Sequence, residues 1–215
     1  KPGRCTSNGN PYEWLPLPYA DYEIYRRIQD ICISMKSEDY LQLPDVVYNY
    51  VDVEMSAKEK EVYEYMRQKK VLPLADEVIR SKNSGVLVSK LLQLANGAIY
   101  GNSDLETNEQ PVYEIHKHKL EKLEEIEENA QGEPILVFYW FKHDLERLKK
   151  AFPHAEVYDP YDTTVEDRWN NKEIPMLLAF PKAIGIGTNI QEGGHIIVWY
   201  SLPMCDLELY QQSNK

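Results

Sequence analysis

The chain has 215 residues, of which 43% are hydrophobic and 27% charged, and its formal net charge is −11. This composition is typical of a soluble globular protein, and the length suits one α/β domain with a substantial additional element. No apolar run approaches the roughly 20 residues that cross a bilayer, and no secretory signal pattern opens the sequence. We therefore expect a cytoplasmic protein without membrane contact.

The negative charge disfavours strong independent binding to DNA, because contacts to phosphates dominate such binding. The excess of acids is local, however: residues 119–133 hold six acids against two lysines, whereas 139–150 and Lys182 are basic. A focused contact surface for nucleic acid thus remains compatible with the composition.

The three cysteines are far apart in the sequence and include no CxxC pair: Cys5, Cys32 and Cys205. This spacing argues against a disulfide framework and against a zinc site. We therefore predict a protein from a reducing compartment without a metal centre.

The first part of the chain is predicted to be an extended arm followed by a helix and a strand. Residues 1–22 contain four prolines and cannot form a long helix, and Trp14 is the expected anchor of this arm. Alternating β-branched and aromatic residues predict a strand over 46–55. Helical spacing predicts an amphipathic helix over 23–35, with an apolar face formed by Ile24, Ile28, Ile31 and Met35.

The middle of the chain is predicted to be mostly helical. Ser56 and Glu59 have the spacing of a capping box that opens a helix over 57–70. A second helix is expected roughly over 75–99, and 101–111 is expected to be a polar loop or the remnant of a β-hairpin. A charged helix follows over 114–130, with Leu120, Leu123 and Ile126 facing inward. His116 and His118 fall on different faces of that helix, so we expect both to be solvated and not to share a metal.

From about residue 130 onward, the sequence pattern changes to apolar runs that alternate with amphipathic segments. Continuous apolar runs are typical of parallel strands buried on both faces, and the alternation predicts right-handed crossovers. We therefore predict an α/β fold with a domain boundary near 130: a parallel sheet flanked by helices, preceded by a mostly helical segment. The predicted strands are 135–140, 155–159, 174–180 and 195–201.

A glycine-bearing turn, 181–191, follows the strand 174–180, and a short helix is expected before 195–201. Gly185 and Gly187 permit close backbone approach, and Asn189 and Gln191 can hydrogen-bond a ribose, a phosphate or a neighbouring loop. The dinucleotide fingerprint G-x-G-x-x-G fails at its last position, which is Ile190. The glycines therefore either form a simple strand-to-helix turn or place a ligand loop at the carboxyl edge of the sheet.

Four segments, in the right order, resemble parts of the Swi/Snf-type branch of the superfamily-two helicases. PKAIGIGTNIQ resembles motif V, and GEPILVFYWFKHDLERLKKAFP resembles motif IV. SKLLQLANGAIYG resembles the L-R-Q-x-x-N segment that precedes the second motor lobe, and ICISMKSEDYLQLPDVVYNYVDVEMSAKEKEVYEYM resembles the end of the first lobe. The resemblance covers about 23–215 and is nearest to the short phage-type and bacterial proteins of this group.

This resemblance implies that 130–215 is a second RecA-like lobe and that 1–129 holds the tail of the first lobe. In an intact motor the two lobes hold ATP and Mg²⁺ between them, and double-stranded DNA and the N-terminal lobe in cis are the implied partners. The resemblance assigns nucleotide binding or coupling to Gly185, Gly187, Asn189 and Gln191. It assigns contact with the DNA backbone to Lys182, Thr188, Lys142 and His143, and the start of motif VI to Gln211 and Gln212.

The sequence contains no G-x-x-x-x-G-K-[ST] and no D-E-x-H, and it reaches Lys215 before the first arginine of motif VI. Phosphoryl transfer needs a phosphate cradle, a bound Mg²⁺ and charge-stabilising arginines together. We therefore expect the isolated chain to bind no cofactor tightly and to hydrolyse no ATP. Two other functions fit the same sequence: a Rossmann-like nucleotide-binding module without a motor, and a non-catalytic interaction domain that uses the acidic helix 114–130.

Overall fold

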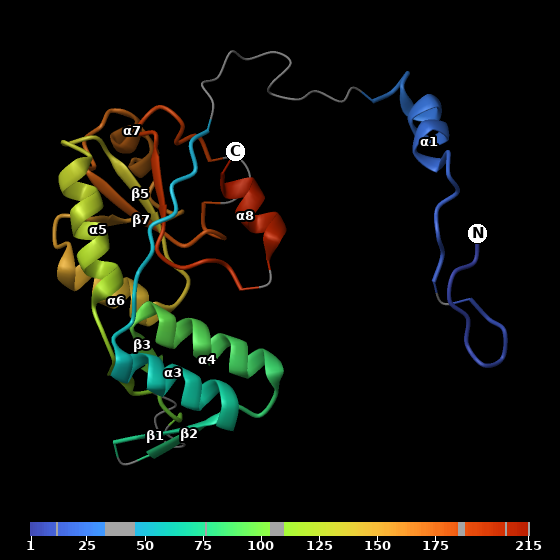
Figure 1. The fold of residues 1–215 in the computed structure, drawn as a ribbon. Helices are drawn as coiled ribbons and strands as arrows, with labels where there is room; N and C mark the ends of the chain where they lie inside the picture. The colour runs from blue at the N-terminus through green and yellow to red at the C-terminus, as the bar shows by residue number, and fades with distance from the viewer. Residues whose placement is uncertain are drawn as a thin grey trace. The chain divides into compact units, whose positions relative to one another are not determined.

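The computed structural model describes residues 1–11, 13–32, 46–75, 77–103, 110–184, 188–204 and 206–214. The chain forms two compact units, Lys1–Tyr50 and Val51–Lys215 (Figure 1). The boundary predicted near residue 130 falls inside the second unit.

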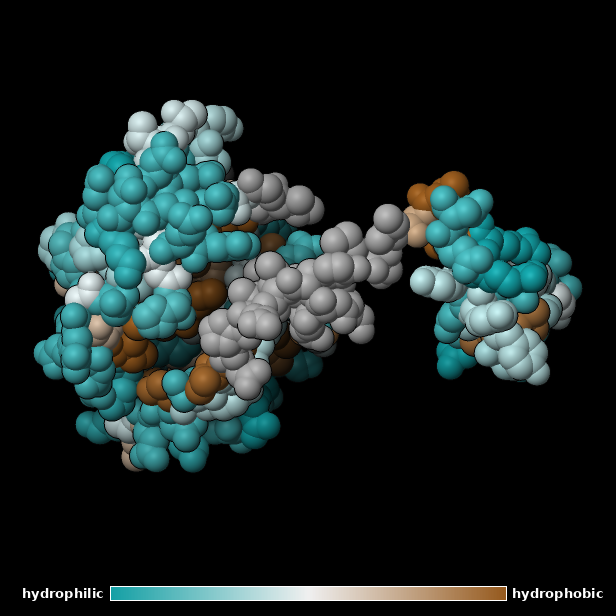
Figure 2. Space-filling model, turned by 90° about the horizontal axis from the view of Figure 1, so that it is seen from above, coloured by the Kyte–Doolittle hydropathy of each residue, from teal (hydrophilic) through white to brown (hydrophobic). Residues whose placement is uncertain are grey.

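The described part of the N-terminal unit consists of an arm folded back on itself and one helix, α1 (Ala20–Ile28). Isolated bridges join Pro2 to Trp14 and Cys5 to Pro11. Trp14 is nonetheless 68% exposed, so its predicted role as an anchor is wrong. None of the residues of α1 is buried, and hydrophobic residues of this unit lie at the surface beside hydrophilic ones (Figure 2).

The prediction of a strand over 46–55 is also wrong. These residues form no β-ladder, and Tyr50 is 90% exposed. A strand needs a partner for its backbone groups, and no described segment pairs with this one. The β-branched and aromatic residues therefore stand in an unpaired, solvent-exposed stretch.

The capping box is confirmed at the start of α3 (Ala57–Lys69). The backbone N–H of Ser56 donates to Glu59 Oε2 at 2.7 Å, and the backbone N–H of Glu59 donates to Ser56 Oγ at 3.4 Å. The left-handed Lys70 ends the helix with φ 60°. The predicted helix 57–70 is thus correct to within one residue.

The helix predicted over 75–99 is shorter in the structure, because an antiparallel hairpin occupies its first part. The strands β1 (Val71–Leu74) and β2 (Glu77–Arg80) pair from Val71 with Arg80 to Leu74 with Glu77. Ala75, with φ 50°, lies in the turn between them. The helix α4 then runs over Ser84–Asn96, with Asn83 Oδ1 accepting from the backbone N–H of Val86 at 2.9 Å.

The two strands of a second hairpin flank the polar loop, in agreement with the predicted alternative of a β-hairpin remnant over 101–111. The strands β3 (Ala98–Tyr100) and β4 (Val112–Glu114) are antiparallel, and the loop residues 104–109 lie outside the described ranges. A small core joins α3, α4 and both hairpins, and its buried members are Met66, Leu72, Ile79, Leu94 and Ile99.

The second half of this unit confirms the predicted α/β fold with a four-stranded parallel sheet. Its strands are β5 (Ile135–Phe138), β6 (Glu156–Val157), β7 (Met176–Ala179) and β8 (Ile196–Trp199). The order is β6-β7-β5-β8, so β5 lies between the other two long strands, with Ile135 opposite both Met176 and Ile196. All residues of β5 and β7 are buried, which explains their continuous apolar runs.

Helices cover both faces of this sheet (Figure 1). The helices α5 (His118–Asn129) and α6 (Lys142–Ala151) cover one face through a core that includes Leu123, Val137 and Leu148. On the other face, α7 (Val165–Asn170) packs through Trp169 against Leu136 and Leu177. The helix α8 (Leu207–Ser213) packs on Trp199 through Tyr210, with ring centroids 4.9 Å apart.

The short helix expected between β7 and β8 is absent from the described residues 180–184 and 188–195, which form turns and irregular backbone. Within the part of the chain that the structure describes, no helix is long and apolar enough to cross a membrane.

Candidate functional site at the carboxyl edge of the sheet

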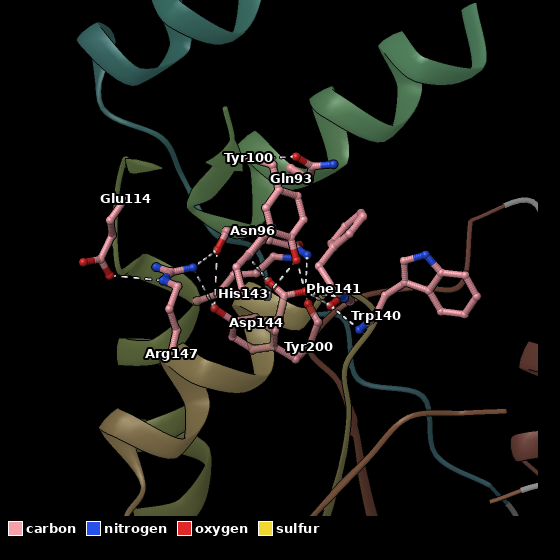
Figure 3. A network of polar contacts seen from close by, with 12 residues as sticks. Gln93, Asn96, Tyr100, Glu114, Trp140, Phe141, His143, Asp144, Arg147 and Tyr200 are labelled. Carbon is pink, nitrogen blue, oxygen red and sulfur yellow. Dashed lines mark hydrogen bonds and ion pairs between the residues drawn. The ribbon is translucent and has the colours of Figure 1, made fainter. Parts of the chain in front are cut away.

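The carboxyl ends of β5 and β8 meet the end of α4 in a buried polar network centred on Asp144 (Figure 3). The Asp144 side chain is 0% exposed, and its Oδ2 accepts three hydrogen bonds. The donors are Asn96 Nδ2 at 3.0 Å, the backbone N–H of Phe141 at 3.2 Å and Ser201 Oγ at 2.6 Å. Burial of a carboxylate is costly unless donors satisfy its oxygens. Here the donors come from the end of α4, the residue before α6 and the end of β8, so Asp144 joins these three segments.

Arg147 extends the network along α6. It follows Asp144 by three positions, so both side chains leave the same face of the helix. Its Nη1 donates to the backbone oxygen of Asn96 at 2.6 Å, its Nη2 donates to the backbone oxygen of His116, and its Nε donates to Glu114 Oε1 at 3.1 Å. The fixed fork of the guanidinium thereby ties α6 to the end of α4 and to the segment that follows β4.

Lys119 supplies a second, partly buried cation next to the carboxylate. Its ammonium donates to Asn96 Oδ1 at 2.7 Å and to the backbone oxygen of Tyr200 at 2.9 Å. Burial lowers the pKa of Lys119, and the negative charge of Asp144 opposes that shift. The Asn96 amide is thus fixed in one orientation, with its oxygen toward Lys119 and its nitrogen toward Asp144.

Tyr200 completes the network from the end of β8. Its hydroxyl donates to the backbone oxygen of Asn96 at 3.3 Å. Burial raises the pKa of the Tyr200 phenol well above its ordinary value, so this hydroxyl stays protonated and acts as a donor.

Gly97 allows the backbone to pass close to Arg147. Its φ is +96°, and a Cβ at this position would lie 2.2 Å from the backbone oxygen of His116 and 2.8 Å from Arg147 Nη2. A glycine is required on both grounds, because an L side chain is strained at this φ and has no room. The turn that leads from α4 into β3 therefore depends on this residue.

His143 is enclosed by aromatic rings rather than presented to solvent. The side chain packs edge-on to Tyr100, with centroids 4.7 Å apart, and stacks on Phe141 at 5.3 Å with an angle of 12°. His143 Nδ1 lies 3.1 Å from Asp144 Oδ1, but neither ring nitrogen forms a hydrogen bond to a described residue. His143 is 3% exposed, so in this conformation it does not reach a DNA backbone; its neighbour Lys142 is exposed.

Lys182, from the turn after β7, lies at the same edge of the sheet. Its ammonium is 5.7 Å from the centroid of the Trp140 ring and 4.0 Å from Asp206 Oδ2. Phe180 packs against the Trp140 ring as well, with centroids 5.2 Å apart. The structure therefore brings a predicted DNA-contact residue next to an aromatic side chain at the end of β5.

The later part of the turn between β7 and β8 contacts α7 and not the polar network. The backbone N–H of Asn189 donates to Glu166 Oε2 at 3.3 Å, and its backbone oxygen accepts from Asn170 Nδ2 at 2.8 Å. The side chains of Asn189 and Gln191 are exposed, and Thr188 is half-buried. Gly185 and Gly187 lie outside the described residues.

Gln211 and Gln212, the predicted start of motif VI, lie on α8 and are both exposed. Gln212 Nε2 donates to Glu208 Oε1 at 3.2 Å within the same helix. The helix is held to the sheet by Trp199 Nε1, which donates to Asn214 Oδ1 at 3.0 Å.

The expectation that both histidines of 114–130 are solvated is wrong for His116. That residue is buried before α5 begins, and its ring stacks on His118 with centroids 4.8 Å apart. His118 Nε2 in turn lies 3.0 Å from Glu59 Oε2, which connects α5 to the capping box of α3. Among the described residues, no group of three or more His, Cys, Asp or Glu side chains is arranged to hold a metal ion.

Sequence reasoning did not single out the members of the polar network, although one signal was available. Gln93 and Asn96 interrupt an otherwise apolar helix, and a polar residue within such a run indicates a buried partner. The partners of Asn96 on α6, Asp144 and Arg147, stand in a charged helix that has the pattern of a solvated face. Their burial follows only from the tertiary arrangement.

Comparison with known proteins finds a phage relative. Protein p41 of Acyrthosiphon pisum secondary endosymbiont phage 1 is 38% identical to this chain over 197 residues, which is 92% of the chain and 41% of p41. The chain therefore spans less than half the length of this phage relative. No family model matches the chain.

Proposed function

We propose that this chain forms the second RecA-like lobe of a Swi/Snf-type DNA-dependent ATPase, which in a full-length protein moves along double-stranded DNA. The observation that carries the proposal is the convergence of three segments on Asp144. Two of these segments, 89–101 and 132–153, are the ones whose sequences resemble the inter-lobe segment and motif IV. The third segment reaches Asp144 through Ser201 at the end of β8, the strand that follows the motif V turn. Their hydrogen bonds meet in one buried network at the carboxyl edge of a parallel sheet, where ligands of open α/β folds bind.

The network has a mechanical role in this proposal. Asp144 and Arg147 fix the end of α4 to the end of the sheet through Asn96, so that the two elements move as one body. A motor that closes around ATP needs such a rigid connection between the segment before the lobe and the lobe itself. ATP and Mg²⁺, held with a preceding lobe, would supply the phosphoryl-transfer chemistry.

DNA contact in this proposal is confined to a small basic area. Lys142 and Lys182 are both exposed at the carboxyl edge of the sheet, whereas the chain as a whole carries a charge of −11. Phosphate contacts by two lysines give weak, salt-sensitive binding. The lobe alone would therefore bind duplex DNA poorly and would depend on a second lobe for affinity.

The test compares ATP hydrolysis by the isolated chain and by a full-length protein that contains it, with and without duplex DNA. We expect no turnover from the chain and DNA-stimulated turnover from the full-length protein. Replacing Lys142 and Lys182 together by Ala should raise the DNA concentration that gives half-maximal stimulation roughly tenfold, without changing turnover in the absence of DNA. Lys60 and Lys172, exposed elsewhere, provide the matched double control.

Two outcomes would contradict the proposal. Tight binding of a mononucleotide by the isolated chain, without any effect of DNA on a full-length protein, would favour the Rossmann-like nucleotide-binding module. A full-length protein that contains no phosphate-binding loop and hydrolyses no ATP would favour the non-catalytic interaction domain.

A further inference from the structure

An open hollow of about 490 Å³ lies beside the amino-terminal end of α6, and its lining combines aromatic rings with an ammonium group. Tyr100, Trp140, Phe141 and Lys142 line it, together with Gln110. Small-molecule sites in proteins range over roughly 300–1,000 Å³, so the hollow has room for one nucleotide. The later residues of the motif V turn contact α7, whereas Lys182 at the beginning of that turn approaches Trp140 at the edge of the hollow.

The aromatic residues around the hollow differ in how firmly they are held. Tyr139, just before Trp140, is buried in the core of the sheet. The ring of Phe141 stacks on the buried His143, and the hydroxyl of Tyr100 accepts a hydrogen bond from the backbone N–H of His143 at 3.0 Å. The rings of Tyr100 and Phe141 are therefore walls of the hollow that contacts with the interior hold in place.

Trp140 is the ring that remains available to a ligand. It is half-buried, and its side chain points away from the polar network (Figure 3). Its contacts are Phe180, with centroids 5.2 Å apart, and the exposed ammonium of Lys182, 5.7 Å from the ring centroid. A cation–π contact at an exposed site is weak, so a flat ring that stacks on Trp140 can displace the ammonium.

We propose that this hollow is a binding site for an unpaired nucleotide, whose base stacks on Trp140 and whose phosphate is bound by Lys142 and Lys182. Aromatic platforms interleaved with cations are the common means by which proteins bind single-stranded nucleic acid, because every base offers a flat face. Bases inside a duplex are stacked on one another and do not offer that face. The site therefore selects single-stranded or locally unpaired strands over intact duplex.

This inference goes beyond the proposed function, because it requires only a nucleotide ligand and neither ATP hydrolysis nor a second lobe. DNA-stimulated ATP hydrolysis without Trp140-dependent strand binding would leave the proposed function standing and overturn the inference. Trp140-dependent strand binding by a protein that hydrolyses no ATP would support the inference and overturn the proposed function.

The experiment measures binding of the isolated chain to fluorescein-labelled oligo-dT strands of about 12 nucleotides at low salt, by fluorescence anisotropy. The comparison ligands are an abasic strand of equal length and charge, a duplex of equal length, and free dTMP as a competitor. We expect the abasic strand to bind at least tenfold more weakly than oligo-dT. Weak competition by dTMP identifies a nucleotide within a strand as the ligand, and competition as strong as that of oligo-dT identifies a free nucleotide.

Two variants of Trp140 separate stacking from folding. Trp140→Ala should weaken oligo-dT binding at least tenfold, to the level of the abasic strand, and leave abasic binding unchanged, whereas Trp140→Phe should keep most of the affinity. Lys142→Ala should weaken both strands by the same factor, since it removes a phosphate contact. Circular dichroism and the thermal midpoint check that each variant is folded. Equal affinity for the abasic strand and oligo-dT, or unchanged oligo-dT binding by a folded Trp140→Ala protein, would overturn the proposal.

Discussion

Asn96 donates its side-chain amide to the carboxylate of Asp144 at 3.0 Å, across 48 positions of sequence, and both residues are buried. This hydrogen bond joins the last residue of α4 to the first turn of α6. The same amide accepts from Lys119, so a single side chain separates a partly buried ammonium from a buried carboxylate. The stability of this edge of the sheet therefore depends strongly on Asn96.

Replacing Asn96 by Ala should destabilise the protein by about 3 kcal/mol, because it removes one hydrogen bond from the buried Asp144 carboxylate and one from the partly buried Lys119 ammonium. The free energy of unfolding in urea, followed by circular dichroism, measures this change. Asn171→Ala is the matched control, since Asn171 is exposed at the end of α7 and should change stability by less than about 0.5 kcal/mol. Equal effects of the two substitutions would contradict the described network.

Gly97→Ala should be more disruptive than the same substitution at Gly132. Both glycines have a positive φ, +96° and +89°, but a Cβ at Gly97 meets the backbone oxygen of His116 at 2.2 Å whereas one at Gly132 meets nothing within 4 Å. We expect the free energy of unfolding to fall by roughly 1 kcal/mol at Gly132, from backbone strain alone, and by more than about 3 kcal/mol at Gly97. The difference in urea midpoint between the two variants is the measurement, and similar losses would show that the close approach at Gly97 is unimportant.

Stability should fall as the pH rises above about 6.5, because His118 loses its positive charge beside Glu59. The hydrogen bond to Glu59 raises the pKa of His118, so the folded state binds the proton more tightly than the unfolded state does. The stabilisation is fully present below the unfolded pKa of 6.5 and disappears as the pH rises through the folded pKa. Burial lowers the pKa of His116, so the contribution of His116 to the free energy of unfolding changes only below about pH 6.5. The two histidines therefore act in different pH ranges.

Urea midpoints at pH 6.5 and pH 8.5 test this dependence. The midpoint should decrease over this interval in the wild-type chain and change little in His118→Gln. A decrease of the same size in the variant would assign the effect to another group.

Asn189→Ala, in a full-length protein, should lower DNA-stimulated ATP turnover roughly tenfold while changing DNA affinity less than twofold. The substitution is structurally mild, because the side chain is exposed and the contacts to α7 are made by the backbone of Asn189. Steady-state ATPase assays and DNA titrations of the same preparation give both values, with Asn171→Ala as the control. Unchanged turnover with lost DNA affinity would make Asn189 a simple DNA contact.

The sequence predicts the sheet well and the region before it less well, for physical reasons. Strands buried on both faces leave continuous apolar runs such as 135–138, and a capping box is a local hydrogen-bonding pattern that needs no tertiary information. The hairpin over 71–80 was missed because the apolar periodicity of the following helix was extended backward across it. The exposure of 46–55 was missed because β-propensity describes residues that fit a sheet but cannot supply the partner strand.

The candidate site was predicted only in part. The turn after β7 was found because glycines and small polar residues after a buried strand are a local signal. The burial of Asp144, Arg147 and His143 was not predictable from spacing, since α6 has the charge pattern of an exposed helix. Only the approach of Asn96 and Ser201 from other elements makes these side chains part of the interior.

The position of β5 in the sheet has a consequence for biosynthesis. β5 pairs with β7 on one side and with β8 on the other, yet it precedes both along the chain. During translation β5 therefore has no partner strand until Ala179 of β7 has been synthesised, and its other edge stays unpaired until Trp199 of β8 has been synthesised. Such delayed, non-local pairing slows folding and exposes the nascent strand to aggregation. The nascent chain would accordingly gain from a chaperone that shields Ile135–Phe138 during this interval.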